Sequence, residues 1–393
     1  MHFICADREW IAISNGSRLL VFGEISNREI TLELPPARPP VKENKPAPKV
    51  APDDTKNTFL GMQFSCCGRW LAAYSSAKQL LIWEAKEWSL ISERYMPKTA
   101  SSMKFTPDSQ AIVIVDKAGD AVLFSTQDLQ KEGEVILGHL SMLLDVLLTP
   151  DGKQIITCDR DEKVRVSQFP NAYNIISYCL GHKEFVSSIS LLPHNTSILL
   201  SASGDGTMRL WNYSKGLALS SYDCSSDVVK HLKVDTSPHI QLEEGKPSSI
   251  IVSKICCHKV ADDTSIVFAL FYGFQGYLVY RITDENIAFV HAELSNMSVL
   301  DLCVRDTGEL LVRVAKGDNY DVVHCFSFDS CTNSLRPSVN SLSFNQMLKK
   351  INAVFKLLDN QSVTSSNVPQ LLKRKFDNVK DYYEQKKARI GEQ

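Results

Sequence analysis

The chain has 393 residues, which would divide into two or three domains of ordinary size unless one large β architecture takes up most of them. Its 43 basic and 45 acidic residues leave a formal net charge of -2, so it is not the polycation expected of a protein that holds nucleic acid unaided. Hydrophobic residues make up 44% and charged residues 22%, which excludes a wholly disordered chain and a coiled coil.

Seven segments of similar pattern follow one another, each with apolar stretches separated by turns. In the middle of the series their third apolar stretches end 41, 43 and 44 residues apart, which is the blade length of a WD-repeat propeller. Two longer intervals, of 61 and 69 residues, contain a proline-rich loop insert at 35–56 and a polar stretch around 235–246. The seven ends lie at Phe22, Trp83, Phe124, Ser167, Trp211, Tyr280 and Phe326.

These repeats predict an all-β fold, a seven-bladed WD-repeat β-propeller that forms one domain over residues 1–345. Residues 346–369 are expected to be a linker or packing segment, and the apolar spacing of 346–358 fits either a helix or a strand. Residues 370–393 have apolar residues at steps of three and four, with seven positive and four negative side chains. This last segment is predicted to be a basic helical tail.

The 11 cysteines are scattered along the chain and include two adjacent pairs, Cys66-Cys67 and Cys256-Cys257. They lack the paired short spacings of a zinc site. No apolar run approaches the roughly 18 residues of a membrane helix, and charged residues close to Met1 disfavour a secretory signal. We therefore expect reduced, mostly buried thiols in an intracellular protein without a membrane partner or a metal site.

The residues that most resemble catalytic groups belong to the fifth repeat, which begins at Gly181. His182, Ser201 or Ser203, and Asp205 are the residue types of a hydrolytic triad. In a WD blade, however, the same types form a structural hydrogen-bond network that satisfies buried polar groups. The chain also has no phosphate-binding glycine loop, HExxH pair or GxSxG elbow. No catalytic residue is therefore assigned.

The fourth repeat begins at Gly138, 43 residues before Gly181. A shift of 44 residues places Asp161 at the position of Asp205. The sequence thus predicts the same network from His139, Thr157 and Asp161, although Ser167 stands where the next blade has Trp211.

The turn from Asp159 to Arg165 is the most informative feature, because six of its seven residues are charged. A blade needs only the turn aspartate there. Since blade strands are antiparallel, 138–142, 159–163 and 181–185 are expected to cluster on one face at the junction of blades four and five. The mixed signs favour a protein partner over bare nucleic acid, and an ordinary solvated turn is the alternative.

Residues 137–146, 159–165 and 180–186 closely resemble the WD-repeat, non-catalytic subunit of the tRNA (guanine-N7-)-methyltransferase. The tail sequence 375–379, followed by a lysine-rich helix, is similar too. The resemblance covers most of the chain in order and is specific from about 137 to 213. The proline-rich insert matches nothing in that family.

This resemblance implies a non-catalytic scaffold that forms a heterodimer with a catalytic subunit. In that family the catalytic partner is a Rossmann-like methyltransferase that binds S-adenosylmethionine and methylates N7 of guanosine at position 46 of tRNA. The propeller stabilises and activates this partner and helps to hold the tRNA. No cofactor is expected on the propeller subunit itself.

The resemblance also implies which residues bind the partner. Arg165 is expected either to meet acidic residues of the methyltransferase or to shape its own turn, and the sequence leaves both open, because Arg209 occupies the same place in a plain blade. The expected partner-binding residues are Arg165, Lys163, Glu162, Asp161, Arg160 and Glu184.

The tail is expected to contact tRNA phosphates, which would supply salt-sensitive affinity without sequence preference. The alternative is a solvated helical face or a disordered end. Two basic pairs in the tail also suggest nuclear import. The expected location is therefore the nucleus, with the cytoplasm as a second location. The expected tRNA-binding residues are Lys373, Arg374, Lys375, Lys386, Lys387 and Arg389.

A substrate receptor of a cullin-type ubiquitin ligase is the alternative function, since many propellers serve in that role. Such receptors often carry Trp-Asp-x-Arg after the third strand of a blade. Here the corresponding stretches begin Trp211-Asn212 and Trp83-Glu84, which makes this alternative weaker.

Overall fold

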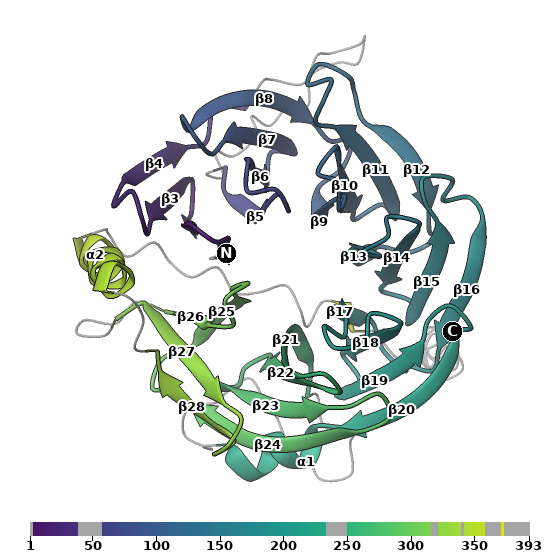
Figure 1. Cartoon of the computed structure of the whole chain (residues 1–393). Coiled ribbons are helices and arrows are strands. Elements are labelled where there is room, and N and C mark those ends of the chain that lie inside the picture. Colours follow the sequence, from purple (N-terminus) through teal and green to yellow (C-terminus); the bar gives the residue numbers. More distant parts are fainter. Residues whose placement is uncertain are drawn as a thin grey trace, which may run out of the picture.

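The computed structural model describes residues 3–37, 57–232, 250–315, 321–338, 342–357 and 371–372. Its strands form seven four-stranded antiparallel sheets, arranged as blades around a central axis (Figure 1). Within each sheet the strand order follows the chain. The predicted seven-bladed propeller is therefore confirmed, including the last two blades, which lack Gly-His and Trp residues.

Blades one to four are numbered in chain order, and the first strand of each lies innermost (Figure 1). Their strands are β1 (Ile4–Ala6), β2 (Trp10–Asn15), β3 (Arg18–Gly23) and β4 (Glu29–Glu33); β5 (Phe59–Phe64), β6 (Trp70–Ser75), β7 (Gln79–Glu84) and β8 (Ser89–Tyr95); β9 (Ala100–Phe105), β10 (Ala111–Asp116), β11 (Asp120–Ser125) and β12 (Glu134–Gly138); β13 (Leu143–Leu148), β14 (Gln154–Asp159), β15 (Lys163–Gln168) and β16 (Ile175–Leu180).

Blades five to seven complete the ring, and two helices accompany them. These elements are β17 (Val186–Leu191), β18 (Ile198–Ser203), β19 (Thr207–Asn212) and β20 (Leu217–Asp223), followed by α1 (Ser225–His231); β21 (Val252–Ala261), β22 (Thr264–Phe271), β23 (Gly276–Ile282) and β24 (Ile287–Leu294); β25 (Val299–Val304), β26 (Leu310–Val314), β27 (Val323–Asp329) and β28 (Ser334–Pro337), followed by α2 (Leu342–Leu357).

The repeat pattern locates the third strand of every blade. Each of the seven residues predicted near the end of a third strand lies in β3, β7, β11, β15, β19, β23 or β27. The second strands, such as β6 and β18, are buried along their whole length because neighbouring blades cover both faces. The fourth strands have one face open to solvent and alternate in burial accordingly.

Carboxylates on innermost strands connect neighbouring blades. Asp145 of β13 accepts hydrogen bonds from the backbone N–H of Ile189 in β17 (3.1 Å) and from the hydroxyl of Ser102 in β9 (2.7 Å). It thereby joins blades three, four and five close to the axis. N–H and O–H donors thereby satisfy this half-buried carboxylate.

The ring closes between blades seven and one without a shared strand, since each sheet uses only consecutive strands of the chain. The backbone N–H of Ile4 donates to Asp301 of β25 at 3.0 Å, as that of Ile189 does to Asp145. Arg305 of blade seven also reaches across the join and binds the carboxylate of Glu24 at 2.9 Å. Polar contacts thus close the ring where a shared strand is absent.

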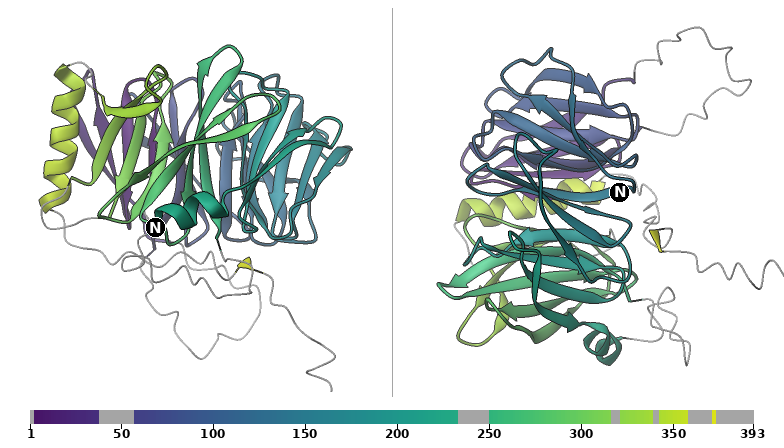
Figure 2. Two further views of the ribbon diagram at one scale, coloured as in Figure 1. Left: turned by 90° about the horizontal axis from the view of Figure 1, so that it is seen from below. Right: turned by 90° about the vertical axis from the view of Figure 1, so that its right-hand side faces the viewer.

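Helix α2 covers the outside of this join (Figures 1 and 2). It buries Phe344, Met347, Ile351 and Phe355, at steps of three and four residues, against side chains of blades one and seven. Asn352 accepts hydrogen bonds from the N–H groups of residues 322 and 323, both at 3.0 Å. The ambiguous segment is therefore a helix, and it begins at Leu342, before the boundary expected at 345.

All eleven cysteines are described and none forms a disulfide, but their burial is less complete than expected. Four are buried, four are half-buried, and Cys66, Cys67 and Cys331 are exposed. The exposed three lie in turns, outside the buried strands. Among the described residues, neither helix is long and apolar enough to cross a membrane.

The insert from residue 38 onward and nearly all of the predicted tail lie outside the described residues; of the tail, only Leu371 and Leu372 are described. The predicted tRNA-binding residues that lie outside are Lys373, Arg374, Lys375, Lys386, Lys387 and Arg389.

Helix α2 is expected to stabilise the closed ring. Ile351→Ala leaves a cavity at the join and should lower the free energy of unfolding by about 2–5 kcal/mol. Urea denaturation followed by circular dichroism measures this change. Lys349→Ala, on the exposed side of the same helix, is the control and should stay within about 0.5 kcal/mol of the wild type. Equal stability of the two variants would contradict a closing role for α2.

Candidate protein-docking face

The structure brings together the three loops predicted to form one face. The backbone N–H of Arg160 donates to the carbonyl of Met142 at 2.9 Å, and Lys163 pairs with Leu180 in the β15–β16 ladder. The negative charge of Glu162 acts on His182 in the next blade. We call residues 138–142, 159–163 and 181–185 the docking face, and 159–163 the charged turn.

Blade five forms the predicted structural network. His182 binds the carboxylate of Asp205 through Nδ1 at 3.1 Å and the hydroxyl of Ser201 through Nε2 at 2.7 Å. Trp211 donates its indole N–H to the same hydroxyl at 2.8 Å. Burial lowers the pKa of His182, and the partly buried Asp205 keeps a lowered pKa because His182 donates to it. These groups hold the blade and are not available for catalysis.

Blade four forms its network with a different aspartate. His139 binds Thr157 through Nε2 at 2.9 Å, as predicted, but its Nδ1 binds Asp159 at 3.0 Å, so the prediction of Asp161 is wrong. Asp159 ends β14 beside the imidazole and also accepts the N–H of Lys163, whereas Asp161 lies out on the turn. The half-exposed Asp161 carboxylate therefore has no part in the network.

Glu162 holds a backbone conformation that normally favours glycine. Its φ is +70°, and the equivalent position of blade five is Gly206 with a φ of +80°. A non-glycine residue in this region costs roughly 1 kcal/mol, and such strain is often found at functional sites. The turn of blade two has Lys78 at the same position, with a φ of +66°. The fold thus accepts a side chain here but does not require one.

Arg165 is 8% exposed, and its guanidinium bonds within the propeller. Nε donates to Ser167 at 2.9 Å, one terminal nitrogen donates to the carbonyl of Gly138 at 3.0 Å, and the other donates to that of Ala172 at 2.9 Å. The small Ser167, in place of a tryptophan, offers a hydroxyl to Nε. These bonds favour the alternative in which Arg165 shapes its surroundings, and they connect blade four to the last strand of blade three.

The beginning of the predicted tail lies against the charged turn. Arg160 donates from Nε to the carbonyl of Leu371 at 3.1 Å, across 211 residues of sequence. Figure 2 shows the short segment 371–372 on the same side of the ring as the N-terminus. The two parts of the chain that the sequence singled out separately therefore meet at one place.

Exposed apolar side chains adjoin the docking face, and they were not predicted from the sequence. Leu140 is fully exposed in the first loop, and Leu180, which pairs with Lys163, is 61% exposed. The sequence signal for this apolar surface was the run Ile175–Leu180. In an outer strand with one face in solvent, apolar and polar residues should alternate, and this run is mostly apolar. The exposed apolar residues along the outer edges of blades three to five are Val135, Leu140, Tyr173, Ile175, Ile176, Tyr178, Leu180, Leu217 and Leu219. Of these, Tyr173, Ile175 and Leu217 lie at the end of the blades away from the charged turn.

The remaining predicted residues lie at the edges of this surface. Glu184 is half-buried in the third loop, and its carbonyl accepts the hydroxyl of Ser203 at 3.1 Å. Next to the first loop, Leu143 is buried in the core, whereas Met142 is half-buried. The docking face thus presents charges of both signs beside apolar surface.

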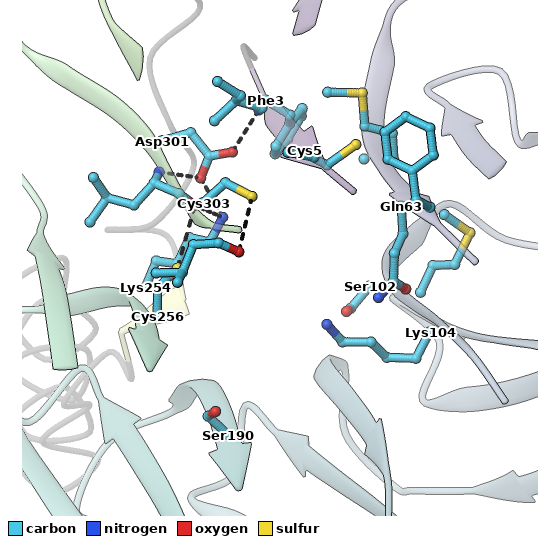
Figure 3. Close-up of a pocket in the computed structure, with 18 of the residues that line it drawn as sticks. Phe3, Cys5, Gln63, Ser102, Lys104, Ser190, Lys254, Cys256, Asp301 and Cys303 are labelled. Atoms are coloured by element: carbon cyan, nitrogen blue, oxygen red, sulfur yellow. Dashed lines mark hydrogen bonds and ion pairs between the residues drawn. The ribbon is translucent and has the colours of Figure 1, made fainter. Parts of the chain in front are cut away.

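A separate cavity of about 1080 Å³ lies on the axis of the ring, lined by innermost strands (Figure 3). On one wall Lys254 forms an ion pair with Asp301, near Cys256 and Cys303. Burial lowers the pKa of Lys254, but the carboxylate of Asp301 outweighs it and raises that pKa, so the ammonium stays charged. Among the described residues no group of His, Cys, Asp and Glu side chains could hold a metal ion.

Comparisons with known proteins identify relatives of the chain. Residues 123–324 match a family described as the tRNA methyltransferase TRM82 WD40 domain. The human tRNA (guanine-N(7)-)-methyltransferase non-catalytic subunit WDR4 is 30% identical over 388 residues, which cover 95% of this chain and 87% of the human one. The non-catalytic subunit wuho of Drosophila melanogaster is 28% identical over 356 residues, covering 86% and 76% of the two chains.

Solved structures agree on the fold. The structure of U3-55K matches with a TM-score of 0.59 and 16% identity over 78% of this chain and 85% of that one. The RRP9 WD40 repeats match with a TM-score of 0.60, also at 16% identity, over 78% and 84% of the two chains. At this identity the likeness shows the propeller fold alone.

The internal bonds of Arg165 lead to a prediction about stability. Arg165→Lys keeps the charge but loses the planar fork that reaches three acceptors, so the free energy of unfolding should fall by about 2 kcal/mol. Thermal and urea denaturation measure the loss. Lys153→Arg, an exposed swap in the same blade, should change stability by less than about 0.5 kcal/mol. An unchanged Arg165→Lys variant would refute the internal role.

Proposed function

The chain belongs to the family of tRNA (guanine-N(7)-)-methyltransferase non-catalytic subunits, and from this premise we propose that its docking face binds the catalytic subunit. It is a WD-repeat subunit of that enzyme and not an enzyme itself. The relatives give no support to the alternative of a cullin-ligase receptor. A non-catalytic subunit implies a catalytic partner, and the docking face is the described surface best suited to receive it.

The observation that carries the proposal is charge that the blade does not need. Blade five makes the same turn with Gly206 and one aspartate. Blade four adds Arg160, Glu162 and Lys163 around Asp161, which takes no part in the histidine network. A glutamate at a φ of +70° lowers the stability of the turn. A role in binding a partner would explain why a glutamate stands at this position. Charges of mixed sign select a complementary protein surface and orient it.

The apolar side chains beside the turn extend this surface. Leu180 and Leu140 adjoin the charges, and the outer face of β16 continues the apolar area away from them. Charges at a rim contribute orientation, while contiguous apolar area contributes most of the binding free energy. We therefore place the catalytic subunit over the charged turn and the neighbouring outer strands of blades three to five.

Arg165 contributes to this interface by positioning. Its guanidinium holds the carbonyl of Gly138, at the start of the first loop, and the carbonyl of Ala172. Loss of these bonds would move the first loop relative to the charged turn. Its own exposed area is too small to form the main partner contact.

The tail is proposed to hold tRNA beside the bound catalytic subunit. Leu371 bonds to Arg160, so the basic residues after it begin at the docking face. Their seven positive charges would bind phosphates without sequence preference. The catalytic subunit would supply S-adenosylmethionine and the reaction at N7 of guanosine. The basic pairs Lys373-Arg374 and Lys386-Lys387 are also proposed to direct the chain to the nucleus.

Glu162→Gly tests the docking face without weakening the fold. Glycine adopts the positive φ freely, so the free energy of unfolding should stay the same or rise by up to about 1 kcal/mol. Co-purification of the catalytic subunit with the tagged chain should fall, and with it the S-adenosylmethionine-dependent methylation of tRNA guanosine in the eluate. The same chain purified alone should show no activity.

Lys78→Gly is the matched control, because it changes the same turn position in blade two. It should leave co-purification and methylation at wild-type levels. If Glu162→Gly and charge reversal by Glu162→Lys both retain the catalytic subunit as well as Lys78→Gly does, the charged turn is not the interface. If the wild-type eluate contains no methylation activity, the assignment to this complex fails as a whole.

Removal of residues 373–393 tests the tail. Losing these positive charges should lower the affinity of the assembled complex for tRNA more at 50 mM than at 200 mM salt, and should flatten the plot of log affinity against log salt concentration. Filter binding or fluorescence anisotropy with unmodified tRNA measures both. An unchanged salt slope would remove the tail from the tRNA-binding surface.

A further inference from the structure

The turn between β5 and β6 in blade two carries the adjacent, exposed Cys66 and Cys67. It closes with a hydrogen bond from the N–H of Gly68 to the carbonyl of Ser65 at 2.9 Å. The equivalent turns of blades three and four are Thr106–Ser109 and Thr149–Gly152, which close in the same way. The three turns can therefore be compared position by position.

In blades three and four the third turn residue is an aspartate that accepts a hydrogen bond from the threonine hydroxyl at the start of the turn. Thr106 donates to Asp108, and Thr149 donates to Asp151, both at 2.6 Å. These hydrogen bonds are the main reason that the pKa of each aspartate is lowered. The position is therefore built to stabilise a negative charge.

Cys67 occupies this position in blade two. The Ser65 hydroxyl accepts the N–H of Trp70 at 2.9 Å, as the Thr106 hydroxyl accepts that of Ala111 at 3.0 Å. The Ser65 hydroxyl also lies 3.3 Å from the Cys67 sulfur, within hydrogen-bond distance, and when Cys67 is a thiolate the hydroxyl is the donor. A sulfur thus replaces the carboxylate of the other blades.

The surroundings treat the two thiols differently. Desolvation raises the pKa of Cys67, but hydrogen bonds from the hydroxyls of Ser65 and Ser109 and from backbone N–H groups outweigh it and leave that pKa below its ordinary value. Desolvation and the neighbouring Cys67 raise the pKa of Cys66. Cys67 is therefore the thiol of the pair that more readily forms the nucleophilic thiolate.

We propose that Cys67 and Cys66 form a redox pair that reacts with hydroperoxides. The Cys67 thiolate attacks the terminal peroxide oxygen, the O–O bond breaks, and Cys67 becomes a sulfenic acid. Hydroxide leaves from hydrogen peroxide, or alkoxide from an alkyl hydroperoxide, and takes up a proton. Cys66 then loses its proton and attacks the Cys67 sulfur, the S–O bond breaks, and a disulfide forms as hydroxide leaves and takes up that proton to become water. The two thiols supply the two electrons that reduce the peroxide.

This disulfide is easily reversed. Neighbouring Cα atoms lie about 3.8 Å apart across a trans peptide, closer than the about 4.4–6.8 Å usual for disulfides, so the bond is strained and readily reduced by thiols. Successive turns of an antiparallel blade lie at opposite ends, which places this pair on the face away from the charged turn. The pair borders the axial cavity and stays accessible when the docking face is covered.

The full-length protein, reduced and then treated with hydrogen peroxide and an alkylating agent, tests this proposal by peptide mass spectrometry. The peptide holding Cys66 and Cys67 should lose about 2 Da, escape alkylation and recover with dithiothreitol. The exposed Cys331 in the same sample is the internal control and should react at least about fivefold more slowly.

Two variants separate the steps. Cys66→Ser should stop at a sulfenic acid on Cys67, which dimedone traps. Cys67→Asp restores the residue of the other two turns, so it should fold as well as the wild type and leave Cys66 no more reactive than Cys331. Oxidation of Cys67 at the rate of Cys331, or its passage to sulfinic acid without loss of 2 Da in the wild type, would overturn the proposal. None of these outcomes depends on the catalytic subunit.

Discussion

The closure of the ring between blades seven and one is the constraint on which the rest of the structure depends. No sheet combines the first and last strands of the chain, so the carboxylate of Asp301, the N–H of Ile4 and the cover provided by α2 hold blades seven and one together. Arg305 and Arg313 stack on Phe344 and Phe355 of α2, with 4.7 and 4.3 Å from guanidinium carbon to ring centroid. Only a closed ring keeps adjacent loops in a fixed relation.

Given a closed ring, adjacent blades can divide structure and function between them. Blade five keeps the plain arrangement, with Trp211, Asp205 and Gly206, and gains rigidity from it. Blade four moves the aspartate of the network to Asp159, which leaves its turn able to carry other charges. At the position next to Ser167, which replaces the tryptophan, Arg165 makes three hydrogen bonds, two within its own blade and one to Gly138 of blade three. The docking face thus rests on compensations inside its own blade.

The regular part of this molecule was predictable because blade length, turn residues and buried strands repeat. All seven third strands were found, and so was the network around His182. The prediction of Asp161 was wrong because it was made by shifting the fifth repeat by a constant 44 residues. In the structure the imidazole of His139 binds the carboxylate that lies within hydrogen-bond distance, which is that of Asp159. The sequence could not decide between helix and strand for α2. Its apolar spacing fits both, and the surface that it covers, between blades seven and one, is known only from the structure. Nor could the sequence show that Arg165 is buried, because that depends on the space beside Ser167 and on carbonyls of other strands.

In a repeat fold each turn can be compared with the equivalent turns of other blades. The comparison shows which residues the backbone of the turn requires. Glu162 stands where glycine suffices, and Cys67 stands where aspartate suffices. Each substitution has a cost for the blade that carries it: one imposes a positive φ on a glutamate, and the other replaces a 2.6 Å hydrogen bond to a carboxylate by a longer contact to sulfur. The first lies on the face of the charged turn and the second on the opposite face. Because a rigid propeller separates these faces, chemistry at the thiols can proceed while a subunit stays bound at the turn.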